Sequence, residues 1–199
     1  MTKIKMCGIR RREDIEFANA LLPEYIGYVF AKKSRRYISP RDASELTKRL
    51  DGRIIPVGVF VNEPVENVIS AVRSGIIKIA QLHGSEDEAY INHLHSEGIT
   101  VIKAFIVKSA EDIAAAESSA ADFILLDAGM GDGKKFDHEL LKGISRQYFL
   151  AGGLTPENAA DAARVKPYCL DVSSGIETDG FKDFEKMDGF TRAVRNMKG

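Results

Sequence analysis

The chain has 199 residues, of which 44% are apolar and 29% charged, which excludes a disordered chain and predicts one domain over residues 1–199. Its 28 basic and 29 acidic residues give a net charge of −1, so we expect no nucleic-acid partner. Neither a signal peptide nor a run of roughly eighteen apolar residues is visible, so we expect a cytoplasmic protein without a membrane partner.

Short apolar segments along the chain predict buried strands. Their apolar runs are nearly continuous, as in Ile124-Leu125-Leu126, which is typical of parallel strands covered on both faces. Eight units of about 25 residues each predict a single-domain (β/α)8 barrel. An open flavodoxin-like sheet is the alternative, but it uses only about five strands. The expected strands are Lys3 to Cys7, Tyr25 to Phe30, Ile54 to Phe60, Ile76 to Leu82, Thr100 to Phe105, Phe123 to Asp127, Tyr148 to Ala151 and Tyr168 to Val172.

Helix boundary signals separate these segments. Ser39-Pro40 and Thr155-Pro156 each place a capping hydroxyl before a proline at the first helical position. The run Ser85 to Glu88 predicts a capping box. Gly75 and Gly98 stand where helices should end.

Two turns near the C-terminus indicate a phosphate site. The run Leu150 to Leu154 ends in Gly152 and Gly153, and the run Leu170 to Gly175 ends in two serines and a glycine. Backbone N–H groups in such turns can surround a phosphate. Barrels of this class commonly bind phosphate at the loops after strands seven and eight.

Reactive side chains stand at the other predicted strand ends, where such barrels carry their active sites. One thiol, Cys7, ends the first strand, and one carboxylate, Asp127, ends the sixth. The second strand leads to Arg35 and Arg36, and the fourth leads to Gln81-Leu82-His83-Gly84. Cys169 lies in the first half of the eighth strand, away from this end, so we expect it to pack in the core.

These residues together resemble one family. The match covers residue 3 to about residue 183, and the family is phosphoribosylanthranilate isomerase of tryptophan biosynthesis. The resemblance implies a (β/α)8 barrel that isomerises N-(5-phosphoribosyl)anthranilate to the corresponding 1-deoxyribulose 5-phosphate by an Amadori rearrangement, without metal or organic cofactor. The motifs that carry it are Lys5-Met6-Cys7-Gly8-Ile9, Gly27-Tyr28-Val29-Phe30, Ser34-Arg35-Arg36-Tyr37, Gln81-Leu82-His83-Gly84, Leu126-Asp127, Ala151-Gly152-Gly153-Leu154 and Asp171-Val172-Ser173-Ser174-Gly175-Ile176-Glu177.

The resemblance also implies roles for individual residues. Cys7 is the expected general base, Asp127 the expected general acid, and Arg36 the group that holds the anthranilate carboxylate. We expect the glycine-rich run Gly129-Met130-Gly131-Asp132-Gly133 to be a mobile flap over the site. The remaining substrate-binding residues are expected to be Gln81, His83, Gly152, Gly153, Asp171, Ser173, Ser174 and Gly175.

Three rival functions fit the sequence less well. The related histidine-pathway ribotide isomerase would imply an aspartate in place of Cys7 and two phosphate-binding halves, whereas only the C-terminal half shows one. A non-catalytic phosphate-binding barrel would not need both Cys7 and Asp127. A sugar-phosphate epimerase would need a metal site, and the sequence shows no suitable His/Asp cluster. The expected partner is one phosphorylated small molecule, and the expected state is a monomer or a homodimer.

Overall fold

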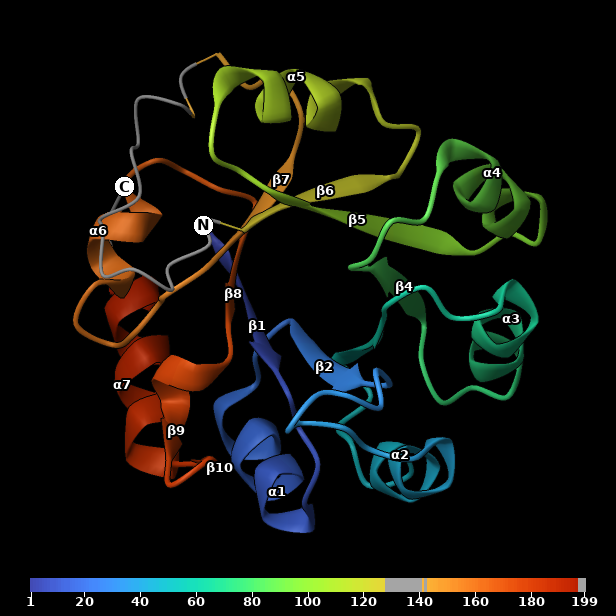
Figure 1. Cartoon of the computed structure of the whole chain (residues 1–199). Coiled ribbons are helices and arrows are strands. Elements are labelled where there is room, and N and C mark those ends of the chain that lie inside the picture. The colour runs from blue at the N-terminus through green and yellow to red at the C-terminus, as the bar shows by residue number, and fades with distance from the viewer. Residues whose placement is uncertain (128–140, 142, 197–199) are drawn as a thin grey trace.

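The computed structural model describes residues 1–127, 141 and 143–196, and within them the strands close into a parallel barrel (Figure 1). Each strand pairs with the next, and β8 pairs with β1 to complete the ring. Helices surround this ring, as expected for the (β/α)8 class. The strands are β1 Lys3–Cys7, β2 Tyr25–Val29, β3 Ile55–Phe60, β4 Ile79–Leu82, β5 Thr100–Ile106, β6 Phe123–Asp127, β7 Tyr148–Ala151 and β8 Cys169–Val172.

All eight strands match the sequence prediction, three of them to the residue. The largest difference is at β4, which begins at Ile79 instead of Ile76. The backbone N–H groups of Ile76 and Ile77 both donate to the carbonyl of Ala71 at the end of the preceding helix. These two isoleucines are therefore core residues in a helix-to-strand turn. The prediction assigned them to the strand because they are apolar.

The helices confirm some boundary signals and correct others. Ser39 caps its helix by accepting a hydrogen bond from the Asp42 N–H, as predicted, and Gly75 and Gly98 follow their helices with φ of 73° and 71°. The cap of α4 is Asp87, not Ser85, because the Asp87 carboxylate accepts the N–H of Tyr90. The helices are α1 Arg12–Leu21, α2 Pro40–Thr47, α3 Val65–Arg73, α4 Glu88–Ser96, α5 Ala110–Ser118, α6 Ala159–Ala163 and α7 Phe184–Arg195.

The start of α6 also differs from the prediction. The helix begins at Ala159, and Thr155 lies in the turn before it. The Thr155 N–H donates to the Asn158 side chain at 2.8 Å, and this hydrogen bond stabilises the turn. Pro156 is thus part of the turn and not the first helical residue.

Strand pleating divides the core into two parts. Side chains that point outward pack against the helices and form the larger apolar cluster. Side chains that point inward fill the lower barrel with a smaller cluster, which includes the fully buried Cys169 and confirms its packing role. Among the described residues, no helix is long and apolar enough to cross a membrane. The predicted flap at residues 129–133 lies outside the described residues.

The chain between β8 and α7 forms a small structure of its own. A 3-10 helix, η2 (Ser174–Ile176), leads into a two-stranded hairpin of β9 (Glu177–Thr178) and β10 (Phe181–Lys182). Gly175 lies so close to the preceding βα turn that a Cβ there would be 1.9 Å from the Leu154 carbonyl oxygen. The turns after β7 and β8 therefore contact each other through backbone.

Gly175→Ala should destabilise the protein, because the added methyl group meets backbone that cannot rotate away. We expect a loss of about 1–3 kcal/mol in the free energy of unfolding, measured by urea denaturation. The matched control is Gly189→Ala inside α7, where the new Cβ would meet Pro156 no closer than 3.5 Å. The control should gain roughly 0.5–1 kcal/mol, as alanine does over glycine within helices. Equal effects of the two substitutions would contradict the close backbone approach.

Candidate active site

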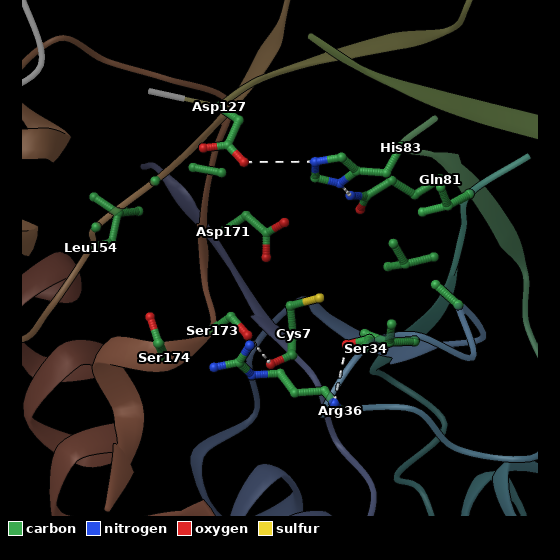
Figure 2. A pocket seen from close by; sticks show the side chains of 17 residues that line it. Cys7, Ser34, Arg36, Gln81, His83, Asp127, Leu154, Asp171, Ser173 and Ser174 are labelled. Atoms are coloured by element: carbon green, nitrogen blue, oxygen red, sulfur yellow. Dashed lines mark hydrogen bonds and ion pairs between the residues drawn. The ribbon is translucent and has the colours of Figure 1, made fainter. Parts of the chain in front are cut away.

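A cavity of about 360 Å³ opens at the carboxyl end of the barrel strands (Figure 2). It takes residues from seven of the eight strands or from the loops directly after them, so the barrel mouth itself is the site. Ten of the eleven residues predicted from the sequence line this cavity. The lining residues are Cys7, Val29, Ala31, Ser34, Arg36, Val59, Val61, Gln81, His83, Asp127, Ala151, Gly152, Gly153, Leu154, Asp171, Ser173 and Ser174.

Gly175, the eleventh predicted residue, does not line the cavity and lies beside it, against the Leu154 carbonyl.

The pleat of the strands explains why these side chains meet. Alternate residues of a barrel strand point inward, so Lys5 and Cys7 share the inner face of β1, and Asp171 and Ser173 share that of β8. The lower inward positions carry apolar side chains, while the upper ones carry a thiol, carboxylates, an amide and an imidazole. The strands thereby bring chemically reactive groups into one layer above an apolar floor.

Cys7 lies at the cavity wall and is half-buried. Its sulfur packs closely against β2, because a Cβ at Gly27 would lie only 2.7 Å from the Cys7 Sγ. Burial raises the pKa of the Cys7 thiol, and the nearby positive charge of Lys5 acts against this rise. The Ser173 hydroxyl donates to the Cys7 carbonyl at 3.1 Å, which fixes the end of β1 to the turn after β8.

A buried ion pair lies directly below Cys7. The Lys5 Nζ is 2.7 Å from the Asp171 Oδ2, and the two residues are register partners on β1 and β8. Lys5 is fully buried, and the Asp171 side chain is only 6% exposed. Burial raises the pKa of Asp171, although the Lys5 charge opposes this effect. The second carboxylate oxygen of Asp171 has no hydrogen-bond partner within the described part of the chain.

Asp127 lies across the cavity from Cys7 and next to His83 (Figure 2). Its Oδ2 is 3.6 Å from the His83 Nε2, and the His83 Nδ1 is 3.3 Å from the Gln81 amide nitrogen. The Gln81 side chain is buried, and its carbonyl oxygen finds no hydrogen-bond partner among the residues described. Gln81, His83 and Asp127 thus form one polar row along the cavity wall between the ends of β4 and β6.

A second cluster of charges fixes the arginine of the site. The Glu177 carboxylate accepts two hydrogen bonds of 2.7 Å from the Nε and Nη2 of Arg36, and a third of 2.8 Å from the Lys182 ammonium. Burial alone would raise the pKa of Glu177, but these donors lower it to about 2. Gly8, with φ of 86°, leaves room for the arginine, since a Cβ there would be 2.5 Å from the Arg36 Cδ. We call Arg36, Glu177 and Lys182 the Glu177 cluster.

The two glycine and serine turns also meet at the cavity. Gly152 and Gly153 adopt φ of 98° and 61°, a backbone region that favours glycine. Ser173 and Ser174 line the same side of the cavity. Within the ranges that the structure describes, no group of three His, Cys, Asp or Glu side chains is arranged to hold a metal ion.

Three charged residues of the site were not predicted from the sequence. Lys5 had a usable signal, because it stands two residues before Cys7 and therefore on the same strand face. Glu177 belongs to a motif that carried the family resemblance, but nothing local indicates that it holds Arg36. Lys182 reaches the site because the β9–β10 hairpin turns the chain back, and the sequence gives no local sign of this.

Comparisons with known proteins agree with this geometry. The family model described as N-(5'phosphoribosyl)anthranilate (PRA) isomerase matches residues 4–193. The N-(5'-phosphoribosyl)anthranilate isomerase of Thermoanaerobacter sp. strain X514 is 43% identical over 206 residues, which cover 100% of both chains.

Solved structures are similar as well. The phosphoribosyl anthranilate isomerase of Thermotoga maritima is 36% identical with a TM-score of 0.92, and the match covers 99% of this chain and 100% of that one. A phosphoribosyl anthranilate isomerase in complex with reduced 1-(o-carboxyphenylamino)-1-deoxyribulose 5-phosphate is 35% identical, with a TM-score of 0.89 and the same coverage. A further structure, of monomers of the dimeric Thermotoga maritima protein, is 36% identical with a TM-score of 0.89, again with 99% and 100% coverage.

Glu177→Gln tests the Glu177 cluster by its pH dependence. The folded pKa of about 2 lies below the ordinary value of 4.5, so the charge stabilises the fold above pH 4.5, and this contribution is lost as the pH falls towards 2. At pH 7 we expect the variant to lose about 1–3 kcal/mol of unfolding free energy in urea titrations, because two cationic donors lose their charged acceptor. The difference from wild type should shrink between pH 4.5 and pH 2.

Glu45→Gln is the matched control, since Glu45 forms an exposed pair with Lys48 at 2.6 Å. Such surface pairs contribute little, so this variant should unfold almost as wild type does. A Glu177→Gln difference that stays constant at all these pH values would show that the carboxylate charge is not what stabilises the cluster.

Proposed function

Because the chain belongs to the N-(5'-phosphoribosyl)anthranilate isomerase family, we propose that Cys7 and Asp127 carry out its reaction as general base and general acid. The protein is an enzyme of tryptophan biosynthesis that converts N-(5-phosphoribosyl)anthranilate to 1-(2-carboxyphenylamino)-1-deoxyribulose 5-phosphate. The single observation that supports the residue roles is the position of this thiol and this carboxylate on facing walls of one cavity.

The proposed reaction is an internal oxidation and reduction that needs two proton transfers. Asp127 donates a proton to the ribose ring oxygen as the C1–O bond breaks, which leaves a protonated Schiff base between C1 and the anthranilate nitrogen. The Cys7 thiolate then removes the proton from C2, and the electron pair of the C–H bond forms the enolamine. Tautomerisation of the enolamine gives the ketone product, so no external oxidant or reductant is consumed. Each transfer requires its group within hydrogen-bond reach of the reacting atom.

Arg36 is proposed to bind the anthranilate carboxylate. Glu177 occupies its Nε and one N–H of Nη2, and a guanidinium carries five N–H donors. The edge formed by Nη1 and Nη2 therefore keeps the fork geometry that suits a carboxylate. Glu177 thus orients the arginine and leaves the position of the anthranilate carboxylate open.

The phosphate is proposed to bind where the turns after β7 and β8 meet. Backbone N–H groups of Gly152, Gly153, Ser174 and Gly175 can surround an anion at this position, while the Ser173 hydroxyl holds the end of β1 against the turn after β8. Binding energy from the phosphate would position the reacting carbons between the acid and the base. Gln81, His83 and Asp171 line the space between these two anchors and are proposed to contact the sugar.

The remaining parts of the proposal concern the working form of the enzyme. We propose that it acts in the cytoplasm, uses no metal or organic cofactor, and is a monomer or a homodimer. A related protein of Thermotoga maritima is dimeric and has also been obtained as monomers, which supports both forms. The histidine-pathway isomerase is the second candidate function, and the thiol at residue 7 is the observation against it.

A fluorescence assay with freshly prepared phosphoribosylanthranilate tests the proposed function. The anthranilate-type signal should disappear at a rate proportional to enzyme concentration. A parallel assay with the histidine-pathway ribotide should give no comparable turnover. If folded protein binds the first substrate without converting it, the protein is a non-catalytic binding barrel and the proposal fails.

Cys7→Ser should fold normally and lose several orders of magnitude in kcat, because a hydroxyl cannot act as a base near neutral pH. The matched control is Cys169→Ser, which changes the other, fully buried thiol below the site. The control should keep nearly all activity and lose some stability from the buried hydroxyl. Activity measured by the fluorescence assay separates the two variants, and wild-type turnover by Cys7→Ser would remove the thiol from the mechanism.

Asp127→Asn should reduce kcat by about 10²- to 10⁴-fold, the range typical of a lost general acid. The amide keeps the size of the side chain, so the affinity for a reduced product analogue, measured by calorimetry, should change little. Asp122→Asn, at a half-exposed carboxylate beside His95 and away from the cavity, is the control and should leave kcat unchanged. If Asp127→Asn kept wild-type kcat, another group would have to donate the proton, and Asp171 would be examined first.

A further inference from the structure

We propose that Lys5 is a positioning residue that, together with Asp171, sets the ionisation of the Cys7 thiol. The proposal extends the proposed function, because it rests on Cys7 acting as the base. Lys5 does not line the cavity and has no direct contact with a bound ligand to make. Its effect would reach the reaction only through the sulfur above it.

The geometry places a buried cation at a fixed position beside this sulfur. Lys5 and Cys7 share the inner face of β1, one pleat apart, and the Lys5 side chain is fully buried. Its ammonium is held at 2.7 Å by the Asp171 Oδ2 on the neighbouring strand, so the charge has a fixed position. Because water is excluded there, the field of this charge is weakly screened.

Stability alone does not account for a buried lysine at this point. Taking two charges out of water costs several kcal/mol per ion, and apolar replacements of such pairs are often neutral or stabilising. The layer directly below is apolar and contains Tyr25, Phe149 and Cys169, so a methionine at position 5 would have suitable neighbours. The ion pair is therefore better explained by its effect on the group above it.

Other charges also face Cys7, and their effects can be ordered. Burial raises the pKa of the thiol most strongly; Lys5 lowers it, Asp171 raises it by less, and Lys182 lowers it further. Arg36 faces the sulfur from the loop after β2, and Asp127 and His83 face the same cavity from β6 and from the end of β4. Arg36 and Lys182 are both paired with Glu177, as Lys5 is with Asp171, and Lys5 has the largest charge effect in favour of the thiolate.

The test measures the thiol directly and needs no substrate. In a Cys169→Ser background Cys7 is the only cysteine, so the pH dependence of its alkylation by iodoacetamide reports its pKa. Lys5→Met should move the alkylation curve to higher pH and slow alkylation at pH 8 by about tenfold, the change expected for one pKa unit. Asp171→Asn should move the curve to lower pH, because it leaves the lysine charge uncompensated.

If the ion pair were purely structural, replacing either partner would loosen the packing around Cys7 and move the alkylation curve in the same direction. Opposite shifts for Lys5→Met and Asp171→Asn therefore indicate an effect of charge. Lys103→Met is the matched control, because Lys103 is also a buried lysine, paired with Glu86 at 3.0 Å, and does not line the cavity. It should leave the Cys7 alkylation curve unchanged. An unchanged curve for Lys5→Met, or shifts of the same sign for Lys5→Met and Asp171→Asn, would overturn the proposal.

A further variant covers the case in which Lys5→Met does not fold because Asp171 is left unpaired. Lys5→Met with Asp171→Leu leaves no buried charge, and its curve should still lie at higher pH than that of wild type. A curve at the wild-type position would overturn the proposal. The alkylation curves can also move as expected while the acid limb of the kcat/KM profile stays where it is. In that case Lys5 still sets the ionisation of the Cys7 thiol, and the proposed role of Cys7 as the base fails.

Discussion

The alternation of inward and outward side chains along closed parallel strands is the constraint on which this structure depends. A barrel of eight strands has an interior only wide enough for side chains, so each inward position is either packed or exposed at one end. The lower inward positions are apolar and close the barrel with aromatic rings such as Tyr25 and Phe149, against which Tyr168 packs. The upper inward positions can then be polar, because they open into the cavity. Stability and chemistry thus occupy different layers of the same strands.

The same constraint explains how much of the molecule could be predicted. Strands such as Phe123–Asp127 are short apolar runs bounded by polar residues, so composition alone located them, and strand ends located Cys7 and Asp127. Ile76 and Ile77 were assigned to a strand wrongly, because burial in a turn and burial in a strand leave the same apolar signature. A backbone hydrogen bond to Ala71, which no sequence pattern encodes, separates the two cases.

For a similar reason, the sequence located side chains that line the cavity but not the charged residues that contact them. Cys7, Arg36 and Asp127 stand at strand ends or in the loops after them, where topology alone brings them together. The partner of Arg36, Glu177, lies 141 positions further along the chain, and the Lys182 ammonium reaches it only through the fold of a hairpin. Pairing over such separations depends on tertiary structure, which periodicity and capping signals do not contain. The pattern of alternate residues could have revealed Lys5, but only with the strand register already known.

Two buried acceptors show how the free energy of this site is linked to its ligand. The Gln81 Oε1 and the Asp171 Oδ1 have no hydrogen-bond partner among the described residues, and each residue lines the cavity. A buried acceptor without a donor costs about 1–3 kcal/mol, more when it is charged, and a ligand that supplies hydroxyl or N–H donors removes that cost. The sugar of a phosphoribosyl compound carries such hydroxyl groups, whereas an analogue without them would leave both oxygens unsatisfied. Sites built in this way reject the analogue more strongly than they reward the substrate, and the proposed sugar contacts of Gln81 and Asp171 would contribute to selectivity in this way.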